Sequence, residues 1–364
     1  MTTSERVAVV GTGLIGTSVA MAAVRAGDQV RGFDTDPQVL RAAAERSGLV
    51  AAEDLAACVR GATLVFVCTP IPSVAQLVVE VLGAVEDAVV TDVASVKSHV
   101  VIEVEASAPT AGLSRFVPGH PMGGSERSGP EHASASVLDG IVWVVAPMPA
   151  SDPAAVERLV SWIAKVGAKP VTIDAERHDR LVAVVSHLPQ VASTSLMGLA
   201  ATEESGEPEI LLLAAGGFRD LTRLAASSPH LWSDILLANR DAIATAIDRY
   251  VDRLLALRDL VTAGNAEEVE TTFADAKAAR LTLAAKPQVR AGVAVLQVPV
   301  PDRPGVLAEV TATMSEATVN IEDLQIVHSA EGGGGLVHLT IAAESVEAAE
   351  RALRERWFEP LRLA

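Results

Sequence analysis

The feature that most constrains the fold is a glycine-rich turn close to the start of the chain. An apolar run suited to a strand buried on both faces, Val7 to Val10, leads directly into Gly11-Thr12-Gly13-Leu14-Ile15-Gly16, and a helix of small residues follows. The first glycine allows a tight turn, the second lets the backbone approach a pyrophosphate, and the third lets helix and strand pack closely. This order predicts a dinucleotide-binding unit, with these residues at the cofactor: Gly11, Gly13, Leu14, Ile15 and Gly16.

An acidic residue follows the second predicted strand. That strand, Gln29 to Phe33, ends in Asp34, at about the separation from the glycine turn that a ribose-binding acid requires. A carboxylate there accepts hydrogen bonds from both ribose hydroxyls and repels a 2′-phosphate, which favours NAD over NADP. The alternative is a turn residue beside loop glycines, but the complete order of strand, turn, helix, strand and acid argues against it.

Strand and helix patterns alternate up to about residue 174, which predicts a doubly wound parallel sheet. Thr69 and Pro70 follow one buried strand, and Ser95 follows the next one. Because strand ends in such a sheet face the ligand crevice, we expect these three residues to border the nicotinamide. The alternative role for Ser95 is a helix N-cap.

A segment dense in glycine and proline, residues 119–129, contains one histidine, one glutamate and one arginine. Its composition predicts an irregular loop beside a cleft, with His120 and Glu126 as candidate functional residues. The alternative is a surface turn whose polar side chains are only solvated.

Strand signals disappear after residue 174, and long helical patterns follow. On a helix expected over 178–192, Asp179, Ser186 and Gln190 fall on one face with His187 beside it. Polar residues on an apolar helix need partners, so a pocket is predicted here, although a satisfied core histidine is the alternative for His187.

A second polar cluster lies at 217–223. Arg219 and Arg223 are four residues apart and therefore share a face of the expected helix, with Asp220 between them. Two guanidinium groups beside a glycine pair suit a carboxylate ligand, and a solvated ion-pair cluster is the alternative. The broad apolar faces of the helical block predict a homodimer.

The sequence of the C-terminal part predicts a linker at 285–292 and then a compact module at 293–364. The pattern of that module is β-α-β-β-α, a split βαβ arrangement that requires one short last strand around Leu361.

Composition excludes several classes of protein. The net charge of −17 argues against a nucleic-acid or anionic-membrane partner. Two cysteines give no disulfide framework and no metal motif, which fits a reducing cytoplasm. The most apolar long segment, Leu181 to Ala201, contains a histidine, a proline and a glutamine, so we expect a buried helix rather than a membrane span.

Five ordered motifs resemble the prephenate/arogenate dehydrogenase family of tyrosine biosynthesis. They are GTGLIG, DVASVK at 92–97, GHPMGGSERSG at 119–129, HDRLVAVVSHLPQ at 178–190 and GFRDLTR at 217–223. The tail resembles an ACT domain, an amino-acid-sensing module, through PDRPGVLAEV and Asn320-Ile321. The two resemblances together cover nearly the whole chain.

The resemblance implies a Rossmann domain at 1–174, an all-helical dimerisation and substrate domain at 175–285, and a βαββαβ ACT-like regulatory domain at 293–364. The implied reaction is an NAD-dependent oxidative decarboxylation. The resemblance also implies a role for each matching residue. In the active site His120 is catalytic, Ser95 orients it, Arg223 binds a substrate carboxylate, and Glu126 and Asp220 form an ionic gate. Around the site Asp179 and His187 line or support the pocket, Trp232 is contributed across the dimer, and in the ACT-like module Gly305 and Asn320 contact an effector such as tyrosine.

One departure leaves the substrate open. Gln190 stands where many members of the family have a second histidine, at a position that borders the substrate side chain. An amide can donate to the keto acid prephenate or accept from the ammonium of arogenate, so its chemistry does not decide. Two other functions are alternatives. One is a 3-hydroxyacid dehydrogenase, which would need a lysine base on the helical domain, and the other is a non-catalytic sensor of NAD and amino acids. The ACT-like tail also has the alternative of a purely structural module.

Overall fold

The structure is a computed structural model, and it describes residues 4–123, 129–204, 206–207, 209–284, 293–301, 303–328 and 335–363. Two compact units emerge from the contacts, Met1–Leu213 with Arg219–Leu254 and Ala214–Phe218 with Leu255–Ala364. The division into three domains at the boundaries expected from the sequence stays a prediction.

Two sheets form the framework of the first unit. Five parallel strands lie in the order β3-β2-β1-β4-β5, and three further strands lie in the order β6-β7-β8. A parallel bridge between Val90 and Phe116 links the edge strand β5 to the segment that leads into β6. The bounds are β1 (Arg6–Val10), β2 (Gln29–Phe33), β3 (Val50–Ala51), β4 (Leu64–Val67), β5 (Val89–Asp92), β6 (Gly119–Pro121), β7 (Val142–Val145) and β8 (Lys169–Thr172).

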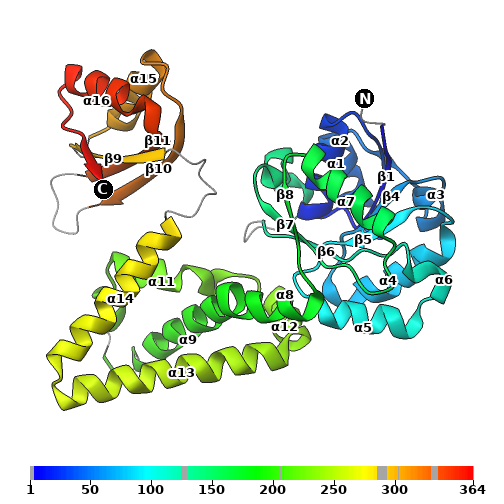
Figure 1. Ribbon diagram of the computed structural model, residues 1–364, viewed down its shortest axis with the longest axis horizontal. Coiled ribbons are helices and arrows are strands. Elements are labelled where there is room, and N and C mark those ends of the chain that lie inside the picture. Colours follow the sequence, from blue (N-terminus) through cyan, green and yellow to red (C-terminus); the bar gives the residue numbers. More distant parts are fainter. Residues whose placement is uncertain are drawn as a thin grey trace. The chain divides into compact units, whose positions relative to one another are not determined.

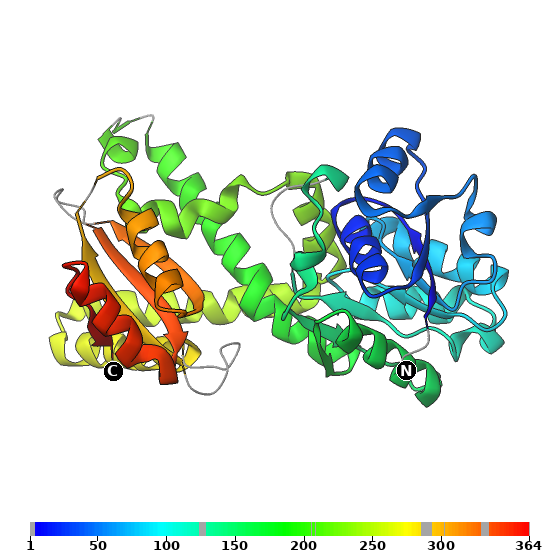
Figure 2. The same ribbon diagram turned by 90° about the horizontal axis from the view of Figure 1, so that it is seen from above.

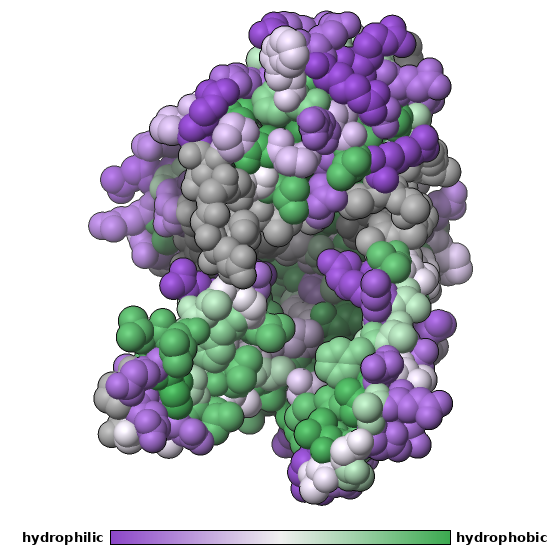
Figure 3. All heavy atoms as spheres, turned by 90° about the vertical axis from the view of Figure 1, so that its left-hand side faces the viewer, coloured by the Kyte–Doolittle hydropathy of each residue, from purple (hydrophilic) through white to green (hydrophobic). Residues whose placement is uncertain are grey.

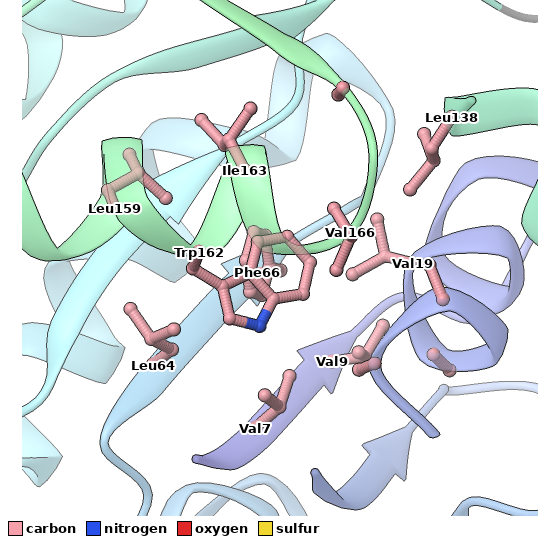
Figure 4. Packing of buried hydrophobic residues seen from close by; sticks show 14 of the residues in the cluster. Val7, Val9, Val19, Leu64, Phe66, Leu138, Leu159, Trp162, Ile163 and Val166 are labelled. Atoms are coloured by element: carbon pink, nitrogen blue, oxygen red, sulfur yellow. The ribbon is translucent and has the colours of Figure 1, made fainter. Parts of the chain in front are cut away.

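Helices cover both faces of the parallel sheet (Figure 1). Alternate residues of β1 enter different cores: Val7 and Val9 lie in one, and Ala8 and Val10 lie in the other. Figure 4 shows the first core, where the rings of Phe66 and Trp162 pack with their planes tilted by 45° and their centroids 4.5 Å apart. The bounds are α1 (Leu14–Arg25), α2 (Pro37–Ser47), α3 (Leu55–Val59), α4 (Ile71–Ala84), α5 (Ser98–Ser107), α6 (Thr110–Leu113) and α7 (Pro153–Lys165), with 3₁₀ turns η1 (Pro130–His132) and η2 (Ala135–Leu138). A Rossmann-like parallel sheet, as predicted, is confirmed.

The helical region begins directly after β8. One continuous run contains α8, a π-helical turn η3 and α9, and α11 and α13 each cross the division between the two units. The bounds are α8 (Ala175–Val182), η3 (Ala183–His187), α9 (Leu188–Glu203), α10 (Glu209–Leu212), α11 (Gly216–Thr222), the 3₁₀ turn η4 (Arg223–Ala226), α12 (Pro229–Ala238), α13 (Arg240–Ala263) and α14 (Ala266–Ala284).

Apolar side chains are exposed on these helices, as the green surface in Figure 3 shows. The run Ala175–Glu203 is long and apolar enough to cross a membrane by length and composition, and only 28% of its most apolar window is buried. Leu181, Val184 and Val185 are exposed, so the expectation of a buried helix is wrong for the single chain. The reason is that only part of the run is covered: Ala183 packs against Ile243 and Ala246 of α13, and Gln190 contacts Leu224 of η4.

The second unit contains an antiparallel sheet in the order β10-β11-β9-β12, and helices α15 and α16 lie on one face of it (Figures 1 and 2). Leu296, Leu339 and Met314 are fully buried in its core. The element order βαββαβ is confirmed, including the short last strand at Leu361, while the expected linker at 285–292 lies outside the described residues. The bounds are β9 (Val293–Val300), α15 (Val306–Glu316), β10 (Ile321–His328), β11 (Gly335–Ala342), the 3₁₀ turn η5 (Ala343–Ser345), α16 (Val346–Glu355) and β12 (Leu361–Leu363).

Candidate active site

The glycine turn has the geometry that a dinucleotide requires. Gly11 has φ of +89°, and a Cβ there would lie 2.7 Å from the carbonyl oxygen of Cys68. A Cβ on Gly16 would lie 1.9 Å from the carbonyl oxygen of Gly11, so helix α1 packs against the turn only because this residue is glycine. Gly13 has no atom within 4 Å of its Cβ position, which leaves open space before the N-terminus of α1. A pyrophosphate fits there, close to the positive end of the helix dipole.

Two polar groups extend this cofactor site. The Asp34 carboxylate accepts hydrogen bonds from the backbone N–H of Thr12 at 2.7 Å and of Asp36 at 3.0 Å, which hold it at the end of β2. The Thr69 hydroxyl is buried and has no hydrogen-bond partner among the described residues, and its Cγ2 lies 2.7 Å from the Cβ position of Gly11. A buried hydroxyl without a partner marks a position where a ligand can bind. The residues present therefore fit NAD.

His120 lies on a strand. The expectation of an irregular loop is wrong for Gly119–Pro121, because these residues form β6 and His120 pairs with Val144 of β7. Proline is tolerated in β6 because this strand lies at the edge of its sheet and needs no N–H there. The strand gives His120 a more rigid backbone than a loop would. Glu126 lies outside the described residues.

A buried ion pair fixes the start of β6. The ammonium of Lys97 donates to the carboxylate of Asp92 and, at 2.8 Å, to the carbonyl oxygen of Gly119, while the N–H of Gly119 donates to Asp92 at 3.3 Å. Both charged side chains are 0% exposed. Burial lowers the pKa of Lys97, and Asp92 opposes that shift. The sequence analysis missed Lys97, although it is the last residue of the DVASVK motif.

Hydrogen bonds connect the ring of His120 to two neighbouring side chains. Nδ1 of His120 lies 2.8 Å from Nε2 of His178, and Nδ1 of His178 lies 2.7 Å from Oδ1 of Asp179. The Asp179 carboxylate also accepts from the backbone N–H groups of Lys97 and Ser98, each at 2.8 Å, and so caps helix α5. His178 was not predicted as a site residue, although it directly precedes Asp179.

The electrostatic environment favours an uncharged His120. His120 is half-buried, and desolvation of its ring lowers its pKa well below the ordinary value of 6.5. The neighbouring His178, Lys97 and His187 disfavour a protonated His120 further. Burial alone would raise the pKa of Asp179, but the hydrogen bonds from His178 and from the backbone of α5 outweigh it and lower that pKa. A neutral imidazole whose neighbour His178 is itself fixed by the Asp179 carboxylate is suited to accept a proton.

A π-helical turn brings His187 to the same network. The expectation of one regular helical face over 178–192 is wrong, because η3 winds more widely than an α-helix and rotates the residues that follow it. The Asn239 amide donates to the carbonyl oxygen of Asp179 at 2.9 Å and lies 3.2 Å from Nδ1 of His187. Burial lowers the pKa of His187 to about 4. The ring of Trp232 lies edge-on to His187 in the same chain, with centroids 6.0 Å apart, and its contribution across a dimer stays a prediction.

Arg223 begins the 3₁₀ turn η4, which packs against α9. The Gln190 amide donates to the carbonyl oxygen of Leu224 at 2.8 Å, and the hydroxyl of Ser193 accepts from the N–H of Ala225 at 3.1 Å. Gln190 therefore holds the segment that carries Arg223. In the part of the chain that the structure describes, the exposed Arg223 side chain has no hydrogen bond or ion pair. The expectation that Arg219 and Arg223 share one helix is wrong, because α11 ends at Thr222.

Several predicted roles remain predictions. Within the described ranges no hydrogen bond joins Ser95 to His120, whose ring contacts His178 instead. Asp220 is exposed on α11, and its proposed partner in an ionic gate, Glu126, falls in the undescribed segment. In the second unit, Gly305 with φ of +89° begins α15, and the Asn320 amide donates to Glu322 at 3.0 Å.

Comparisons with known proteins agree with this geometry. Residues 19–172 match the family described as prephenate dehydrogenase, nucleotide-binding domain, and residues 174–275 match prephenate dehydrogenase, dimerization domain. Residues 296–356 match the AHAS small subunit-like ACT domain.

Individual relatives cover most of the chain. A prephenate dehydrogenase of Bacillus subtilis is 32% identical over 349 residues, which is 93% of each chain. The crystal structure of prephenate dehydrogenase from A. aeolicus in complex with hydroxyphenyl propionate and NAD⁺ covers 77% of this chain and 99% of its own, at 27% identity and a TM-score of 0.72. Synechocystis arogenate dehydrogenase covers 76% of this chain and 99% of its own, at 28% identity and a TM-score of 0.68. This chain belongs to the prephenate dehydrogenase family and is an NAD-dependent oxidoreductase.

Proposed function

We propose that this enzyme catalyses the NAD-dependent oxidative decarboxylation of prephenate to 4-hydroxyphenylpyruvate. The observation that carries the proposal is the geometry of His120: Nδ1 of its ring lies 2.8 Å from Nε2 of His178, and its strand β6 is held by the contacts of Gly119 with Lys97 and Asp92. A base held in one orientation, in a chain that also contains a dinucleotide turn, suits the oxidation of an alcohol.

Prephenate has a ring hydroxyl at C4 and a ring carboxylate at C1. When bound at the glycine turn, NAD accepts a hydride from C4. His120 accepts a hydrogen bond from the hydroxyl and then takes its proton as the hydride leaves. The C1 carboxylate departs as CO2, its bonding electrons complete the aromatic ring, and His120 returns the proton to the oxygen of the new phenol. Arg223 binds a carboxylate of the substrate through its guanidinium group.

Arogenate, which carries an amino acid side chain instead of a keto acid, is the second candidate substrate. One of the similar solved structures is an arogenate dehydrogenase, and the Gln190 amide is hydrogen-bonded to Leu224 in this chain. That hydrogen bond supports a role for Gln190 in holding η4 rather than in selecting the substrate side chain.

Steady-state formation of NADH, followed by its absorbance with prephenate and with arogenate, tests the proposal. We expect a higher kcat/KM with prephenate. A higher kcat/KM with arogenate would make arogenate, and not prephenate, the proposed substrate. Failure to oxidise either compound would overturn the proposed reaction. The same assay with added tyrosine tests the effector role of the ACT-like module, for which Gly305 and Asn320 are the proposed contacts.

The assembly and the location are further parts of this proposal. The match to a dimerization domain and the exposed apolar side chains of α8, η3 and α9 support a homodimer. Two free cysteines support a reducing cytoplasm.

A further inference from the structure

The direction of the hydrogen bonds behind His120 follows from the chemistry of Asp179. An ionised carboxylate only accepts, so the hydrogen between Asp179 and His178 resides on Nδ1 of His178. A neutral histidine has one ring hydrogen, which leaves Nε2 of His178 as an acceptor. The nitrogen of His120 that lies 2.8 Å away, Nδ1, must then be the donor. The other nitrogen of His120, Nε2, is left with a free lone pair.

We propose that His178 is a positioning residue, which accepts from Nδ1–H of His120 and so selects the tautomer whose Nε2 can take the substrate proton. This inference rests on the proposed function, because it assigns His178 a part in the step that His120 carries out. The geometry resembles that of a metal-bound or catalytic imidazole whose second nitrogen is fixed by a neighbouring group.

The position of His178 is fixed from several sides. The His178 side chain is 0% exposed, and its helix α8 is capped by Asp174, whose carboxylate accepts from the N–H of Arg177 at 2.8 Å. Asp179 connects α8 to the first N–H groups of α5, and Asn239 binds the carbonyl oxygen of Asp179. His178 therefore cannot rotate away from His120 without breaking buried hydrogen bonds.

The charged and titratable groups around His120 come from three directions. Asp92 ends β5 and its partner Lys97 directly precedes α5. His178 and Asp179 lie on α8, and His187 lies in η3. A cationic His178 would reverse the hydrogen bond, because it would donate Nε2–H to Nδ1 of His120. In that state Nε2 of His120 would carry the hydrogen and could not act as the base.

Two amide variants separate the positioning role from a structural one. In His178→Gln the amide reaches the place of Nε2, so its oxygen can accept from His120 while the bond to Asp179 is lost. In His178→Asn the amide reaches the place of Nδ1, so its NH2 can donate to Asp179 while His120 loses its acceptor. The two substitutions are matched in chemistry and differ in which of the two hydrogen bonds they keep.

For the positioning role we expect kcat with prephenate to fall by about 100-fold in His178→Asn and by less than about tenfold in His178→Gln. The KM for prephenate and the Kd for NAD should change by no more than about twofold. If His178 served only to hold Asp179 and α5, the order would reverse, with His178→Asn the more active variant. That reversed order, or equal activity of wild type and both variants, overturns the inference.

A spectroscopic measurement on the wild-type enzyme requires no turnover, and a variant serves only to assign the signals. Nitrogen-15 chemical shifts of the imidazole groups at about pH 8 distinguish the two neutral tautomers, and the spectrum of His120→Asn identifies the His120 signals among the eight histidines. We expect hydrogen on Nδ1 of His120, and hydrogen on Nε2 would overturn the inference. Failure of the wild-type enzyme to oxidise prephenate or arogenate would overturn the proposed function, while this tautomer would remain a property of the free protein.

Discussion

The two ends of the candidate site are built differently. At one end, the His120 ring is bound by His178 and its strand is held by a fully buried ion pair. At the other end, Arg223 is exposed at the start of a 3₁₀ turn and, among the described residues, has no partner. The proposed proton-accepting end is therefore held by contacts within the single chain, and the proposed carboxylate-binding end is exposed.

The difference follows from how the two interactions depend on distance. Proton transfer requires donor and acceptor atoms within hydrogen-bond reach and correctly aligned, so a small displacement of the base is costly. Attraction between a guanidinium and a carboxylate falls slowly with distance, and the long arginine side chain can adjust to its ligand. A fixed base and an adjustable cation are therefore compatible in one site.

The largest expected effect is at the fixed end. Replacement of His120 by asparagine removes the proton acceptor, and we expect kcat to fall by about 10³-fold. The Kd for NAD, measured by calorimetry, should stay within about twofold, because the glycine turn and Asp34 are unchanged. Turnover equal to that of the wild type would show that His120 is not the base.

The open end should respond in KM rather than in kcat. Arg223→Ala removes a charge-assisted hydrogen bond, and we expect the KM for prephenate to rise by about 10- to 100-fold with kcat changed by less than about threefold. Arg219→Ala is the matched control, because Arg219 is also exposed but lies on α11, before the helix ends. An equal rise of KM in both variants would mean that the effect comes from net charge and not from a specific contact.

The framework of the site could be predicted from the sequence because local patterns specify it. The glycine turn, Asp34 and the βαββαβ order of the second unit each depend on a short run of residues whose periodicity and glycine positions are readable. His120, Asp179 and His187 were predicted as site residues through the motifs that contain them, and in the structure one network of hydrogen bonds connects the three.

The groups that hold His120 could not be predicted in the same way. A lysine is ordinarily expected to be exposed to solvent, so the sequence gives no sign that Lys97 is buried. Only the folded chain brings Asp92 and the Gly119 carbonyl around it. The pairing of β6 with β7 joins His120 to Val144, and the π-helical turn changes the rotation of His187 relative to Asp179. The contact of Lys97 with Gly119 and the pairing of β6 with β7 join segments distant in sequence, which periodicity does not report. The π-helical turn is a local departure from the regular helical period on which the prediction relied.

The smallest expected effect is in the pH profile. Since burial and the nearby positive charges lower the pKa of His120, the neutral base persists to more acidic pH than in an exposed histidine. A base with an ordinary imidazole pKa of about 6.5 would lose about half of its activity at that pH. We expect kcat/KM for prephenate to fall by much less than half between about pH 7.5 and pH 6.5, and to decline only at lower pH.

The profile of Arg223→Ala should have the same shape, because that residue does not contribute to the pKa of His120. A midpoint near the ordinary imidazole pKa in the wild type would mean that the surroundings of the half-buried His120 ring do not disfavour its protonated form, and the contrast between a base held by its neighbours and an exposed cation would then be lost.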